Sequence, residues 1–139
     1  MINQHTIISY FINKPKAIFL VDSIGAFLSA FCLLIISRFY GNYFGINPST
    51  LQLLTILPIV FCIYSACCYL LVKRSYKPFI QIIAMANLFY GLITLILMGT
   101  QFAEITFLAL SYFVLELMIL VLIILLEFKI IHDIIPNKV

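Results

Sequence analysis

Four long apolar segments constrain the fold of this chain more than any other feature of its sequence. A helix needs about 20 predominantly apolar residues to cross the hydrocarbon core of a bilayer. Four segments reach that length, and charged or turn-forming residues separate them. We predict that they cross the membrane as α-helices, at residues 17–37, 51–72, 78–98 and 105–126.

The composition argues against a water-soluble fold. Hydrophobic residues make up 65% of the 139 residues and charged residues only 9%, whereas soluble domains are about 45–50% apolar and about 25% charged. A soluble domain of this size could not bury so much apolar surface. The sequence therefore predicts a single all-α domain, a polytopic membrane protein built as a four-transmembrane-helix bundle with the lipid bilayer as its partner.

The distribution of positive charge predicts the orientation of the bundle. With the N-terminus inside, Arg38 is the one basic residue on the outer side, and all other Lys and Arg residues fall on the inner side. Such a bias in short loops follows the positive-inside rule. Both termini are therefore expected in the cytoplasm and the protein in the cell inner membrane. The inner residues are Lys14, Lys16, Lys73, Arg74, Lys77, Lys129 and Lys138.

Residues 1–16 combine basic groups with apolar residues that share one helical face, among them Phe11 and Ile12. This pattern is typical of a short amphipathic helix at the membrane surface. A partly ordered tail is the alternative. Farther along, Ser49 and Gln52 have the spacing of a capping box that would open the second span.

No catalytic, cofactor-binding or metal-binding motif is present, so an enzyme is not expected. The basic residues form no stripe that would bind nucleic acid. Cys67 and Cys68 are adjacent and could be acylated or bind a soft metal. Because His5 and His132 both lie outside the predicted spans, we interpret these cysteines as buried, inert thiols.

Glu116 is the most informative residue, because it lies near the middle of the fourth predicted span. Ionisable groups at this depth usually face the bundle interior or a water-filled cavity. Tyr112 lies on the same helical face, and Asn87 has a similar depth in the third span. We expect a contact between Glu116 and Asn87. It would serve either as a proton or cation site or as a link between helices.

Asp22 lies near the cytoplasmic end of the first span and shares a stripe of small residues with Gly25, Ala26, Ser29 and Cys32. We expect this stripe to be the packing face of the span, because small residues let helices approach closely. A salt link to Lys73, Arg74 or Lys77 is the expected role of Asp22. A coupling-ion or proton-entry site is the alternative.

Two other faces are less apolar than the rest of their spans. The third span places Ala84, Asn87, Gly91 and Thr94 on one line, and the second places Cys62, Ser65 and Tyr69 together. A four-helix bundle with a modestly polar interior needs such faces.

The segments 21–31 and 78–87 resemble those of uncharacterised four-span bacterial membrane proteins, a resemblance that implies a fold but no activity. Two functions remain open. The first is a non-enzymatic accessory, structural or assembly subunit. The second is a small oligomeric proton- or cation-coupled transporter or channel that uses the intramembrane carboxylate. A homo-oligomer or another membrane subunit is the expected protein partner.

Overall fold

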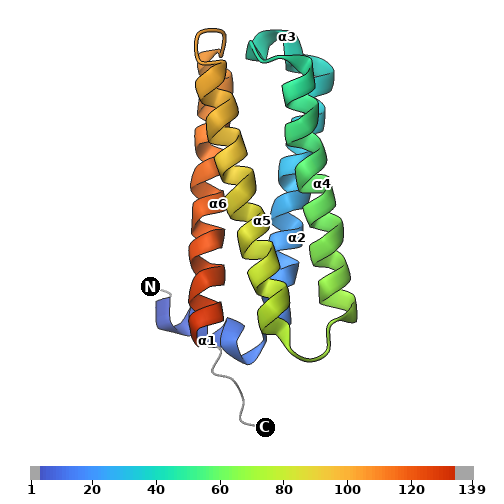
Figure 1. Ribbon diagram of the computed structural model, residues 1–139, viewed down its shortest axis with the longest axis vertical. Helices are drawn as coiled ribbons and strands as arrows, with labels where there is room; N and C mark the ends of the chain where they lie inside the picture. Colours follow the sequence, from blue (N-terminus) through green and yellow to red (C-terminus); the bar gives the residue numbers. More distant parts are fainter. Residues whose placement is uncertain (1–3, 134–139) are drawn as a thin grey trace.

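The computed structural model describes residues 4–133, and these residues form helices joined by short connections (Figure 1). Four helical segments are long and apolar enough to cross a membrane, which confirms the predicted four-span, all-α fold. A short helix, α1 (Gln4–Asn13), precedes them. The spans are α2 (Lys16–Ile35), continued by the π-helical η1 (Ile36–Tyr40) and by α3 (Gly41–Phe44), then α4 (Pro48–Leu71), α5 (Tyr76–Thr100) and α6 (Phe107–Asp133).

The four spans pack as two antiparallel hairpins. Helix α2 makes its most extensive contact with α4, and α5 packs mainly against α6. The contact between α2 and α6 is much smaller. The seam between these two helices is therefore loosely packed.

Helix α1 and the C-terminal end of α6 lie at the same end of the bundle, together with the connection between α4 and α5 (Figure 1). Lys14, Lys73 and Lys129 are consequently grouped at this end, and Arg38 lies toward the opposite one. The grouping agrees with the charge pattern of the sequence. Which end faces the cytoplasm stays a prediction, and Lys138 lies outside the described residues.

Within the segment 1–16, residues Gln4–Asn13 form a helix, and its position at the membrane surface stays a prediction. Helix α1 packs against α6 and α2. Its Phe11 is buried in a cluster with Ile18 and Ile130, so the helix closes one end of the bundle. The side chains of the first eight residues, including His5, Ile7 and Ile8, lie outside the described part.

Gly45 allows the connections at the opposite end to come very close together. Its φ of 65° is left-handed, and a Cβ at this position would lie 1.8 Å from the carbonyl oxygen of Glu104. Next to it, the Thr106 amide donates to the Phe44 carbonyl at 3.2 Å, and the Thr106 hydroxyl donates to the Tyr43 carbonyl at 2.8 Å. The connection after η1 is thereby joined to the one before α6.

The start of α4 differs from the predicted capping box at Ser49. Asn47 is the N-cap, and its Oδ1 accepts a hydrogen bond from the Ser49 amide at 3.0 Å. Pro48 takes the first helical position, where a missing N–H has no cost. The Asn47 amide donates to Gln101 Oε1 at 2.9 Å, so this cap also joins the two end connections.

The interior contains two apolar clusters, one toward each end of the bundle. Helix α1 and the neighbouring ends of the spans supply the first, which includes Phe19 and Ile80. The second includes Leu33, Phe44 and Phe113. Most of the buried polar residues come from positions along the helices between these clusters; they are Asp22, Ser65, Asn87, Glu116 and Glu127.

Candidate functional site

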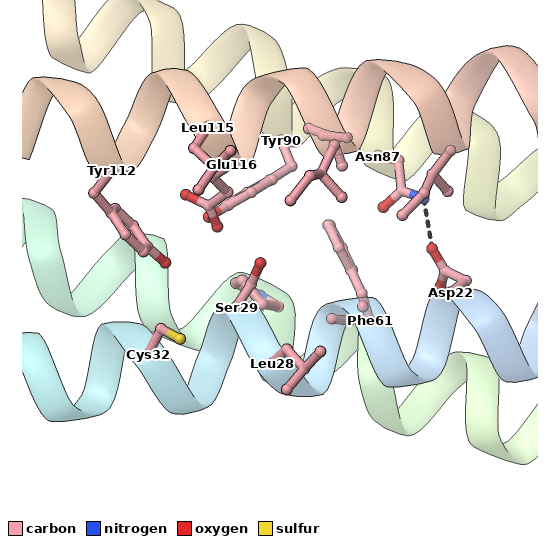
Figure 2. Close-up of a pocket in the computed structure, with 16 residues that line it drawn as sticks. Asp22, Leu28, Ser29, Cys32, Phe61, Asn87, Tyr90, Tyr112, Leu115 and Glu116 are labelled. Carbon is pink, nitrogen blue, oxygen red and sulfur yellow. Dashed lines mark hydrogen bonds between the residues drawn. The ribbon is translucent and has the colours of Figure 1, made fainter.

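A cavity of about 220 Å³ lies in the loose seam between α2 and α6 (Figure 2). Helix α2 lines it with the stripe of small residues, and α6 lines it with the face that carries Glu116. The stripe had been expected to pack tightly against a neighbouring helix. Gly25 does approach Ile123, to which a Cβ would be 3.3 Å away, but most of the stripe borders the cavity. The stripe residues that line it are Asp22, Gly25, Ala26, Ser29 and Cys32.

Glu116 is buried in the wall of this cavity, with 9% of its surface exposed. Its Oε1 accepts a hydrogen bond from the hydroxyl of Tyr90 on α5 at 3.0 Å. Its Oε2 is buried and has no hydrogen-bond partner among the described residues. Ser29 points toward the carboxyl group from α2, across the cavity, and is a further polar group close to it, although no hydrogen bond of ordinary geometry joins the two (Figure 2). Glu116 therefore presents a carboxyl oxygen that is not satisfied by a hydrogen bond.

The expected contact between Glu116 and Asn87 is not formed. Both residues line the cavity, but they lie at different levels of the bundle. Asn87 is about one helical turn nearer the α1 end than Tyr90, because α5 runs away from that end. Tyr90 takes the place beside Glu116, and the amide of Asn87 reaches two other carboxyl groups.

Asn87 is the centre of a four-helix polar cluster, to which each membrane-spanning helix contributes one residue. Its Nδ2 lies 2.7 Å from Asp22 Oδ1, and 3.3 and 3.4 Å from the two carboxyl oxygens of Glu127. The hydroxyl of Ser65 donates to Asp22 Oδ2. All four side chains are buried. In this cluster each carboxyl oxygen accepts a hydrogen bond.

The salt link expected for Asp22 is wrong. Lys73 and Arg74 are exposed, and the ion pair found within residues 4–133 joins His132 to Asp133. Asp22 lies deep enough in the bundle to meet Ser65 and Asn87 instead. The basic side chains remain at the surface, where their charge is solvated.

Glu127 was not predicted, because the fourth span was expected to end at residue 126. Helix α6 continues to Asp133, and the side chain of Glu127 is fully buried. A signal for it exists in the sequence. Glu127 follows Glu116 by about three helical turns, so the two carboxyl groups lie on one face of the helix. Tyr90 also went unpredicted, although it follows Asn87 by about one turn.

Tyr112 lies in the cavity wall, on the same face as Glu116 as predicted. It is partly buried, and its ring packs edge-on against Phe113 and Phe44, with ring centroids 5.2 and 6.1 Å apart. Its hydroxyl points toward the cavity (Figure 2). The site therefore has two phenol groups, Tyr90 and Tyr112, near one carboxyl group.

No group of three or more His, Cys, Asp or Glu side chains in the described chain could hold a metal ion. The prediction of buried thiols is confirmed for Cys68 but wrong for Cys67, which is exposed on the outside of α4. The two thiols thus differ in their surroundings despite being adjacent. His132 is exposed at the end of α6.

Comparison of the chain with protein-family models, curated proteins and solved structures found no match. The role of the protein is therefore inferred from the cavity and from the carboxyl groups around it.

Proposed function

We propose that this protein is a small proton- or cation-coupled transporter of the membrane, with Glu116 as its coupling group. One observation carries the proposal: Glu116 is buried at membrane depth, and its Oε2 has no hydrogen-bond partner beside a cavity. A charged residue at the centre of a membrane helix costs about 2.5–3.5 kcal/mol on insertion scales. Residues of this kind are mostly found where ions, protons or substrates are bound.

The chemistry of a single carboxyl group supports coupling of cation transport to proton transport. A carboxylate can hold one proton or pair with one cation, and the two compete for the same oxygen atoms. Binding of a cation then releases a proton, and binding of a proton releases the cation. Such exclusive binding is the basis on which a transporter exchanges one for the other.

The four-helix polar cluster has a different role in this proposal. The carboxyl oxygens of Asp22 and Glu127 all accept hydrogen bonds, whereas only one oxygen of Glu116 does. A satisfied cluster links helices, since interhelical hydrogen bonds stabilise membrane bundles by about 0.6 kcal/mol on average. We assign Asp22, Asn87 and Glu127 to structure, and Glu116 to function.

The charge bias supports an orientation with both termini in the cytoplasm, in the inner membrane. The cavity beside Glu116 measures only about 220 Å³, which is too small for a separate aqueous pathway through a single bundle. We therefore propose that the working unit is a homo-oligomer.

An accessory or assembly subunit is the second candidate, and the open side of the cavity favours it. Leu28, Leu115 and Ile119 line the cavity and are each more than half exposed. A helix of another membrane protein could pack on these residues and cover Glu116. In that case the carboxyl group would bind a polar residue of the partner rather than a transported ion.

Proton flux in reconstituted vesicles tests these candidates. The purified protein is placed in liposomes that contain a pH-sensitive dye, and flux is driven by a potassium diffusion potential or by an opposing sodium gradient. We expect flux above that of protein-free vesicles, and a fall to that background in Glu116→Gln. Glu104→Gln is the matched control, because Glu104 is exposed in the turn before α6.

Equal flux in the wild type and in Glu116→Gln would contradict the transporter. Flux at background in both, together with a membrane protein that co-purifies with the wild type and is lost in Glu116→Gln, would favour the accessory subunit.

A further inference from the structure

Building on the transport function proposed above, we propose that the cavity binds a small lipophilic organic cation, such as a monoamine with one ring, which enters from the bilayer between α2 and α6. This ligand class follows from the charge, lining, size and opening of the cavity.

The charge of the cavity selects a cation. Within residues 4–133, its lining contains Asp22 and Glu116 but no Lys, Arg or His. Both oxygens of Asp22 accept hydrogen bonds from the four-helix polar cluster. Glu116 Oε2 is thus the acidic oxygen left without a partner. One such oxygen fits a ligand with one positive charge and an N–H donor.

The lining favours an organic cation over a metal ion. Calcium takes about 6–8 oxygen ligands and magnesium about six, whereas the oxygen-bearing side chains near Glu116 are those of Ser29, Tyr90 and Tyr112. The remaining lining is mostly aliphatic and aromatic, with the ring of Phe61 packed edge-on against that of Tyr90. Aromatic rings attract a nearby ammonium group, and the apolar walls suit a hydrocarbon body.

The size of the cavity limits the ligand to a small molecule. Sites for drug-sized ligands have volumes of about 300–1,000 Å³, and this cavity measures about 220 Å³. A single aromatic ring with a short aminoalkyl chain fits this volume better than a multi-ring compound does.

The opening of the cavity faces the membrane. Leu28, Leu115 and Ile119 line the cavity and are 55%, 59% and 51% exposed, so on this side the cavity is bordered by groups that contact lipid tails. The two ends of the bundle are blocked. Hydrogen-bonded connections close the end at Gly45, and the apolar cluster with Phe19 closes the end at α1. A ligand that reaches Glu116 must therefore dissolve in the bilayer.

Binding of a fluorinated monoamine to the full-length protein in nanodiscs tests the proposal. The probe is 4-fluorophenethylamine, observed by fluorine NMR, and empty nanodiscs correct for its partition into lipid. The matched neutral probe is 2-(4-fluorophenyl)ethanol, which has almost the same shape. We expect saturable binding of the amine and at least about tenfold weaker binding of the alcohol, since a hydrogen bond between charged groups is stronger than one between neutral groups.

Two pairs of variants assign the binding to the cavity. Glu116→Gln should weaken amine binding by about tenfold or more, whereas Glu104→Gln, in the exposed turn, should leave it unchanged. Ala26→Leu fills the cavity without removing its carboxyl group and should also weaken binding. Its matched control is Ala103→Leu, at an exposed position outside the cavity. If Glu116→Gln fails to fold, the comparison of amine binding between Ala26→Leu and Ala103→Leu still tests whether the amine binds in the cavity.

Wild-type affinity in Ala26→Leu or Glu116→Gln, or equal binding of the alcohol and the amine, would overturn the inference. Proton flux that depends on Glu116 but is unaffected by the amine, together with no saturable amine binding, would overturn this ligand and leave the transporter standing. Amine binding that depends on Glu116, with no flux, would support the ligand and remove the transport function.

Discussion

Asn87 Nδ2 lies 2.7 Å from Asp22 Oδ1, and this hydrogen bond links α5 to α2 across the bundle. The same nitrogen also reaches Glu127 on α6, and Ser65 adds α4 to the group. Direct packing between α2 and α6 is slight. One amide group thus helps to hold together the two helical hairpins, next to the cavity that lies between them.

Replacing Asn87 by Leu should destabilise the bundle, because the substitution removes the donor that Asp22 and Glu127 share. We expect a loss of about 1–2 kcal/mol in the free energy of unfolding. Unfolding in mixed micelles by titration with sodium dodecyl sulfate, followed by circular dichroism, measures it. Asn42→Leu, at an exposed position in α3, is the control and should change little. Equal unfolding curves for Asn87→Leu and wild type would refute the assigned role.

Replacing Gly45 by Ala should be more damaging than a typical surface change. The left-handed backbone disfavours a Cβ by about 1–2 kcal/mol, and the added atom would overlap the carbonyl oxygen of Glu104. We expect a lower melting temperature in detergent. Gly41→Ala is the matched control, because its backbone is helical and nothing lies within 4 Å of the added Cβ. A melting temperature for Gly45→Ala equal to that of the control would show that the two connections are not closely packed.

The positive-inside bias predicts that the connection with Ser75 faces the cytoplasm and that the turn with Ala103 faces outward. Single cysteines at these positions, in a chain whose four native cysteines are replaced by serine or alanine, test this orientation. A membrane-impermeant maleimide added to intact cells should label Ala103→Cys and spare Ser75→Cys until the cells are opened. The reverse labelling pattern would invert the topology, and labelling of both in intact cells would exclude it.

The spans and the polar face of α5 could be predicted from the sequence because they depend on local patterns, whereas the face predicted for α4 is only partly buried, with Ser65 inside and Tyr69 exposed. Ala84, Asn87, Gly91 and Thr94 fall on one line of a helix, and all four are buried. Helix geometry alone is enough for that prediction. The Asn47 cap was missed because Ser49 and Gln52, close by, also have the spacing of a capping signal. The hydrogen bond from the Asn47 amide to Gln101 could not be predicted, because Gln101 belongs to a turn far along the chain.

The hydrogen-bond partners of the acidic residues could not be predicted, because they depend on how far each helix is shifted along the bundle axis relative to its neighbours. Glu116 and Asn87 both lie near the middle of their spans, yet a difference of about one turn gives each a separate partner. Glu127 was not predicted, because the fourth span was expected to end one residue before it, at residue 126. Helix α6 has 27 residues, more than the roughly 20 that cross a bilayer. The neighbouring helices therefore bury the Glu127 carboxyl group, which a helix of about 20 residues would leave outside the membrane.

Carbodiimide labelling tests most directly the central claim that Glu116 is reachable from the bilayer. Dicyclohexylcarbodiimide dissolves in lipid and adds to protonated carboxyl groups, and mass spectrometry of the digested protein identifies the modified residue. We expect modification at Glu116, slowed by the fluorinated monoamine, and little at Glu127, whose side chain is fully buried. Modification of Glu127 with Glu116 left intact would contradict the account, as would modification of Glu116 at the same rate with and without the amine.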